Sequence, residues 1–70
     1  MTRDEVNNVL EHHPGQSFRL SFDNTKAEIR VVSADPDGML CRPVTALEDP
    51  SMDFWVSYSH IQSIEPIQQA

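Results

Sequence analysis

The chain has 70 residues, with eleven acidic side chains against five lysines and arginines and a formal net charge of −6 at pH 7. A chain of this length forms one domain, residues 1–70, and buries roughly 60% of the surface that its unfolded form exposes. Cys41 is the only cysteine, which excludes a disulfide within the chain. The charge favours a basic partner and opposes free DNA or RNA.

The location of the protein is predicted from its cysteine content and its first residues. A lone cysteine fits a reducing compartment, and the opening Met-Thr-Arg-Asp-Glu lacks the apolar run of a secretory signal. No apolar stretch approaches the roughly 20 residues that cross a bilayer. We therefore expect a cytoplasmic protein that does not enter a membrane.

Residues 3–13 are predicted to form one amphipathic helix. Val6, Val9 and Leu10 are spaced at i, i+3 and i+4, which places them on one helical face. Pro14-Gly15 then ends the helix.

Residues 17–67 are predicted to form five short strands. From Ser17 the apolar residues recur with a period of two, as in a half-buried strand. Turn signals at Asp23-Asn24 and at residues 35–38, an acidic loop at residues 46–52, and helical spacing from Ile61 to Ile64 separate the strands. The expected strands are residues 17–23, 26–34, 39–45, 53–58 and 63–67.

Two of these strands carry predictions about their faces. In the third strand Leu40 and Val44 are expected to face the core, while Pro43 marks an edge or a bulge. In the fourth strand Val56 is expected on the core face and Trp55 on the opposite face, at least partly exposed in a single chain.

These elements predict a mainly β, α+β domain. An N-terminal helix precedes a five-stranded, bent, antiparallel sheet, and the economical arrangement closes that sheet into a small barrel capped by the helix.

The end of the chain carries a family resemblance. YSHIQSIEPI, residues 58–67, resembles the end of the bacterial Hfq-type members of the Sm-like family, in which a Tyr-Lys-His step leads into the short turn before the last strand. Ser59 stands where that family has a lysine. The resemblance implies an Sm-like or SH3-like small barrel that assembles into a ring, with Tyr58 and His60 near the pore where the family contacts uridine-rich RNA.

A second resemblance is to the Rho-binding antiterminators, which are acidic Sm-like proteins with an N-terminal helix. It rests on LEHH, residues 10–13, before the first strand, and on the isoleucine-containing turn after the fourth strand. It implies an acidic surface that occupies a nucleic-acid-binding partner.

Three functions therefore remain open. The first is a homo-oligomeric Sm-like ring that binds single-stranded RNA at Tyr58 and His60, with its subunit interface at Trp55, Val56 and Ile64. The second is an acidic regulator that docks on a basic, nucleic-acid-binding protein. The third is a structural subunit of a larger assembly.

Catalytic and metal-binding motifs are missing from the sequence. It contains no phosphate loop, no catalytic triad spacing and no dinucleotide fingerprint. His12 and His13 are adjacent helical positions that point about 100° apart, so they do not readily share an ion. Cys41 lies beside Arg42 without a positioned base. We expect no enzyme activity, no cofactor and no bound metal.

Overall fold

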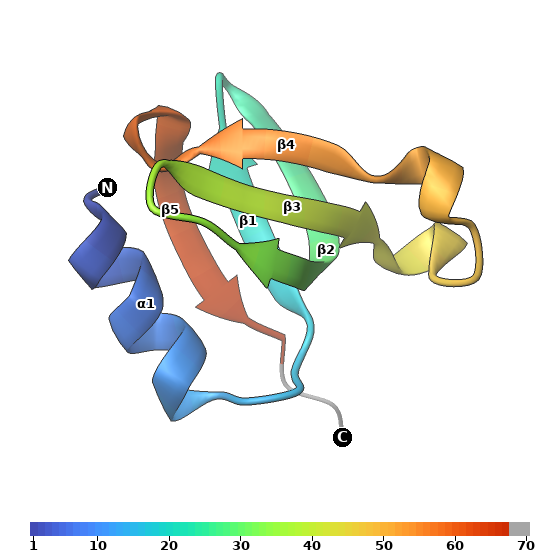
Figure 1. Ribbon diagram of the computed structural model, residues 1–70, viewed down its shortest axis with the longest axis horizontal. Coiled ribbons are helices and arrows are strands. Elements are labelled where there is room, and N and C mark those ends of the chain that lie inside the picture. Colours follow the sequence, from blue (N-terminus) through green and yellow to red (C-terminus); the bar gives the residue numbers. More distant parts are fainter. Residues whose placement is uncertain (68–70) are drawn as a thin grey trace.

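The computed structural model describes residues 1–67, and residues 68–70, the end of the predicted domain, lie outside the described residues. The chain forms one α-helix and five strands in the predicted order (Figure 1). They are α1 (Arg3–His12), β1 (Phe18–Phe22), β2 (Thr25–Ala34), β3 (Gly38–Pro43), β4 (Phe54–Ser57) and β5 (Ile61–Pro66). Two 3-10 turns, Val44–Ala46 and Pro50–Met52, connect β3 to β4, and a third, Tyr58–His60, connects β4 to β5.

A capping box starts α1. The backbone N–H of Glu5 donates to the Thr2 hydroxyl at 3.2 Å, and the backbone N–H of Thr2 donates to the Glu5 carboxylate at 3.2 Å. These bonds satisfy donors that a helix start leaves without a partner. Val6 is fully buried, and α1 packs against β5 (Figure 1).

The sheet is antiparallel throughout, with the strand order β4-β3-β2-β1-β5. β1 to β4 follow one another as hairpins, and β5 returns along the free side of β1. Asp23 and Asn24, with φ angles of 46° and 61°, form the two-residue loop between β1 and β2. Two consecutive positive φ angles match the twist of the strands in such a hairpin.

The predicted helix and five-stranded antiparallel sheet are confirmed, but hydrogen bonds do not close the sheet into a barrel. β4 and β5 remain its two edges, because β4 pairs only with β3 and β5 pairs only with β1. The 3-10 turn between them carries the chain from one edge to the other. Side chains fill the open side of the bent sheet.

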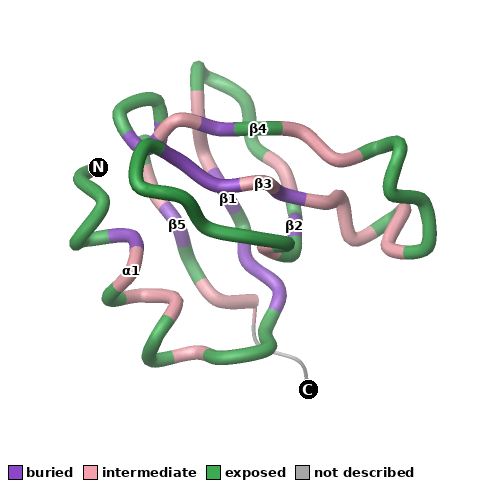
Figure 2. Tube along the Cα trace, viewed as in Figure 1, coloured by how far each residue is buried: buried purple, intermediate pink, exposed green. Residues whose placement is uncertain are grey.

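The core lies on the inner face of the sheet and under α1. Figure 2 shows the buried positions as purple segments on β1, β3, β5 and neighbouring elements. The buried core residues are Val6, Phe18, Leu20, Ile29, Met39, Cys41, Val56, Tyr58, Ile61 and Ile64.

The prediction that Leu40 and Val44 face the core was wrong. Met39 and Cys41 are fully buried, whereas Leu40 is only half-buried on the other face. Val44 lies beyond the strand, in the following 3-10 turn. Apolar residues occupy three consecutive positions here, so the sequence shows no alternation that would select the core face. The pairing of β3 with β4 determines which face is buried.

β5 begins at Ile61, two residues earlier than predicted. Ile61 pairs with Phe22, and Ser63 pairs with Ser21, so the register shifts by one residue at Gln62. This β-bulge lets two isoleucines three positions apart both face the core, which regular alternation forbids.

Candidate functional site

The free edge of β4 is the first feature of the candidate site. The backbone N–H of Tyr58, just after β4, donates to the Asp37 carbonyl at 3.2 Å, toward the β3 side. Successive residues of a strand direct their backbone groups to opposite sides. The N–H and C=O groups of Trp55 and Ser57 therefore point away from β3, to the side where β4 has no neighbouring strand.

Trp55 provides an exposed aromatic surface beside this edge. Trp55 is 48% exposed, as the alternation of the sequence predicted. The indole lies over Gly38, where an added Cβ would sit 2.8 Å from Trp55 Cζ2. The absence of a side chain at Gly38 therefore gives the indole its position.

The other two residues predicted for a subunit interface lie in the core. Val56 is 3% exposed and Ile64 is 7% exposed, so their side chains contact the interior of a single chain. Their strands, β4 and β5, are nevertheless the two edges of the sheet. Their backbones, rather than their side chains, are placed where another chain could contact them.

Tyr58 supports the acidic turn between β2 and β3. Its ring is buried, with 4% of the residue exposed, and its hydroxyl donates to the Asp35 carbonyl at 2.8 Å. Together with the bond from the Tyr58 N–H to the Asp37 carbonyl, this fixes both ends of the turn. Burial raises the pKa of the Tyr58 hydroxyl above its ordinary value.

The turn that Tyr58 supports carries two exposed carboxylates. Within residues 1–67, neither Asp35 nor Asp37 has an ion-pair partner. The Ser57 hydroxyl lies 3.4 Å from the Asp37 carbonyl, so the turn also contacts the end of β4. Two exposed carboxylates without an ion-pair partner in residues 1–67 thus lie on a held turn next to the edge strand.

His60 lies on the far side of the same region and is exposed. Its Nδ1 lies 3.1 Å and 3.2 Å from the two carboxylate oxygens of Asp23. Asp23 was predicted as part of a turn and not as a site residue, because the pairing of β1 with β5 brings the 23–24 turn beside residue 60. Tyr58 and His60 share one turn, but only His60 is accessible.

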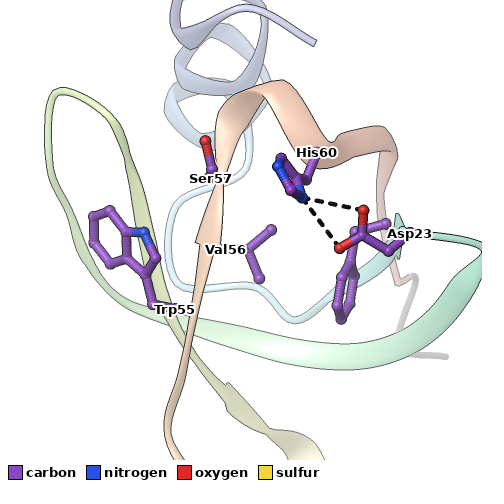
Figure 3. Close-up of a pocket in the computed structure, with 6 residues that line it drawn as sticks. Asp23, Trp55, Val56, Ser57 and His60 are labelled. Atoms are coloured by element: carbon purple, nitrogen blue, oxygen red, sulfur yellow. Dashed lines mark hydrogen bonds and ion pairs between the residues drawn. The ribbon is translucent and has the colours of Figure 1, made fainter.

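A hollow of about 200 Å³ runs beside the free edge of β4. Its lining residues are Phe22, Asp23, Trp55, Val56, Ser57 and His60. Figure 3 shows Val56, His60 and Asp23 on one side of the β4 ribbon and the Trp55 indole on the other. The free edge therefore lies between an apolar and acidic hollow and an exposed aromatic ring.

Arg42 and Asp53, before the start of β4, form the least exposed of the ion pairs within residues 1–67. Arg42 Nε and Nη2 donate to the two oxygens of Asp53 at 2.6 Å and 3.1 Å, and Nη1 donates to the Leu47 carbonyl at 3.0 Å. The hydrogen bond from Arg42 lowers the pKa of the Asp53 carboxyl. Arg42 is thus occupied in holding the 44–53 connection.

Cys41 and the histidines form no recognisable catalytic or metal centre. Burial raises the pKa of the Cys41 thiol to about 12, so the thiol stays protonated at neutral pH. In the described part of the chain, no three His, Cys, Asp or Glu side chains are grouped as metal ligands. The ten-residue α1 is the one α-helix between residues 1 and 67, and no helix there is long and apolar enough to span a membrane.

Comparison of the chain with protein-family models, with curated proteins and with solved structures finds no match. The geometry of the chain itself must therefore support any functional proposal.

Proposed function

We propose that this chain is a non-catalytic protein-binding module of Sm-like architecture that docks an acidic surface on a basic, nucleic-acid-binding partner. The observation that carries the proposal is the attachment of the Asp35–Asp37 turn to Tyr58. A hydroxyl bond and a backbone bond hold that turn against β4, so the backbone that carries its two carboxylates is held in place. Preorganised charge loses little conformational entropy on binding.

Net charge supports the same proposal. A chain with a formal charge of −6 attracts basic surfaces over a distance and repels phosphates. Asp23, Asp35 and Asp37 lie on the two turns that contact the Tyr58–His60 connection, and they add to this field locally. A basic protein that binds nucleic acid would meet here a surface of the opposite sign.

The proposal is tested by retention of proteins on immobilised chain. We would compare wild type with the triple variant Asp23→Asn, Asp35→Asn and Asp37→Asn, and with a matched control, Glu11→Gln, Glu48→Gln and Glu65→Gln. Basic proteins retained by wild type and by the control, but lost with the aspartate variant and at high salt, would support the proposal. Equal retention by all three chains would contradict it.

Self-assembly through the sheet edges is compatible with this architecture. β4 and β5 are both edges, and pairing β4 of one copy with β5 of the next would remove both from solvent. Light scattering coupled to size exclusion measures the mass directly. Several subunits per particle would support the ring or a structural assembly subunit, whereas a monomer would leave the acidic module acting alone.

RNA binding is the second candidate function, and one observation favours it. His60 lies in an open polar hollow with Asn24, Ser59 and Gln62, whose groups could bond to the edge of an unpaired base. Tyr58 contributes less to this candidate because its ring is buried. Titration of a labelled uridine-rich oligonucleotide at low salt should then give binding that His60→Ala removes and His12→Ala leaves intact. Absence of binding would exclude this candidate.

A further inference from the structure

We propose that the free edge of β4 is a docking strand for an extended, basic segment of another protein, in which Lys or Arg residues alternate with apolar ones. This inference rests on the proposed function and names the partner's chemistry and its place of contact. The segment would add a sixth strand to the sheet at β4.

The first argument is that β4 is a weakly protected edge. Natural sheets protect such edges by keeping them very short or with lysine, proline, a bulge or a covering element, and β4, at four residues, has only the first of these protections. β4, Phe54–Ser57, contains no lysine or proline and pairs with β3 in regular register. The opposite edge, β5, ends at Pro66, and α1 packs against it (Figure 1).

The second argument is the hydrogen-bonding capacity of that edge. The N–H and C=O groups of Trp55 and Ser57 point away from β3, as the bond from the Tyr58 N–H to the Asp37 carbonyl requires. Trp55 provides a donor and an acceptor, and Ser57 provides a donor, because the Ser57 carbonyl is the N-cap acceptor of the 3-10 turn Tyr58–His60. An extended segment laid along β4 would pair with them as in other cases of strand addition.

The third argument is the difference between the two sides of that edge. Side chains of an added strand would alternate between the Trp55 indole and the hollow beside Val56 (Figure 3). Val56 and Phe22 make part of the hollow apolar, which suits an aliphatic side chain. A cation above the indole gains from the aromatic face and has the Asp37 turn beside it.

The fourth argument is charge complementarity. Asp37 directly precedes Gly38, the pairing partner of Ser57, on one side of β4, and Asp23 lines the hollow on the other side. An acidic or neutral segment would gain nothing from either group, so a cationic segment is the preferred occupant over a second copy of this acidic chain.

The experiment uses the full chain and a synthetic peptide of alternating arginine and valine, followed by Trp55 fluorescence and by amide exchange. Ser57→Pro is the decisive variant. Ser57 has a φ of −71°, which proline adopts without strain. From the backbone, the substitution removes only the N–H that points away from β3. Ser57→Ala is the matched control, because it removes the same hydroxyl and keeps the N–H.

We expect saturable binding to wild type and to Ser57→Ala, and binding about tenfold weaker for Ser57→Pro. Trp55→Ala, which lacks the fluorophore and is therefore followed by amide exchange alone, should weaken binding by roughly 30-fold, a typical loss for an interface tryptophan. The amides of Trp55 and Ser57 should exchange more slowly in the complex. A peptide of alternating glutamate and valine should not bind.

Three other outcomes would overturn the inference. If the arginine peptide binds equally well to Ser57→Pro and Ser57→Ala, the partner is basic but β4 is not its strand, and the proposed function survives alone. If wild type is oligomeric and Ser57→Pro alone makes it monomeric, the occupant of the edge is a second copy. Failure of every basic probe to bind would remove the proposed function as well.

Discussion

The rings of Phe22 in β1 and Phe54 in β4 stack with their centroids 5.7 Å apart and their planes 25° apart. β1 and β4 are not neighbours in the sheet, because β2 and β3 lie between them. The stacking therefore shows how strongly the sheet bends. At the open side of the sheet, contact between these aromatic side chains takes the place of the interstrand hydrogen bonds that would join the edges of a closed barrel.

Loss of this stack should lower stability without changing the fold. We expect Phe54→Ala to reduce the free energy of unfolding by about 2 kcal/mol, less than for a fully buried phenylalanine because the ring is half-buried. A double-mutant cycle with Phe22→Ala should give a coupling of about 1 kcal/mol, measured by urea unfolding. Additive effects would mean that the two rings do not interact in solution.

The two glycines should respond differently to alanine. At Gly38 a Cβ would lie 2.8 Å from Trp55 Cζ2 and 2.9 Å from Ser57 Cα, so Gly38→Ala should cost about 3 kcal/mol and displace the indole. Gly15 has a φ of 72° and no atom within 4 Å of such a Cβ, so Gly15→Ala should cost only about 1 kcal/mol. Thermal unfolding and tryptophan fluorescence report both effects. Similar losses for the two variants would contradict the close packing at Gly38.

Stability should fall in alkaline solution because of Cys41. Burial, aided by the charge of Asp53, raises the pKa of its thiol from 9.0 to about 12. Between these values the unfolded chain releases a proton that the folded chain keeps, so the free energy of unfolding decreases by up to about 1.4 kcal/mol per pH unit. Below pH 9.0 the thiol is protonated in both states, and the stability that is lost in alkaline solution is fully present.

Urea unfolding of wild type and Cys41→Ala across this range measures the effect. The variant should be less stable at neutral pH, since it loses buried atoms, but its stability should depend less steeply on pH. The slope is the informative quantity, because the packing loss does not change with pH. Equal slopes for both chains would show that the thiol does not titrate in this way.

The Arg42–Asp53 pair should produce the opposite pH dependence in acid. The hydrogen bond from Arg42 lowers the pKa of Asp53, so the stability from this pair is present above the ordinary carboxyl range and is lost as pH falls through the lowered pKa. Asp53→Asn should lower the melting temperature at pH 7 and flatten its decrease toward acid. Glu48→Gln, which removes a charge from the same connection, is the control and should have little effect.

The sequence predicted the elements well because their signals were local. The spacing of Val6, Val9 and Leu10 in α1, the alternation in β1 and the turn at Asp23-Asn24 each act within a few residues. Trp55 was correctly predicted to be exposed because its strand alternates clearly. The core face of β3 was predicted wrongly because Met39, Leu40 and Cys41 are all apolar. In the structure, Gly38 packs closely against β4, and Met39 and Cys41 lie on the buried face.

The candidate site was less predictable because it depends on distant contacts. The partner of the Tyr58 hydroxyl is a backbone carbonyl 23 residues earlier, and Asp23 lies 37 residues before His60. No spacing rule connects such positions. The bulge at Gln62 likewise follows from pairing with β1, so helical spacing in the sequence suggested a turn where the structure has a strand.

The strand order also determines how the chain must fold. Four strands pair with their immediate successors or predecessors, and the tight loop at Asp23-Asn24 makes the β1–β2 hairpin the cheapest contact to form. The pairing of Phe18 with Pro66 instead closes a loop that contains most of the chain. Since long loops close late, we expect the meander to form first and β5 to dock last. Until that step, the core side of β1 lacks Ile61 and Ile64, and the nascent sheet is most exposed to association with other chains.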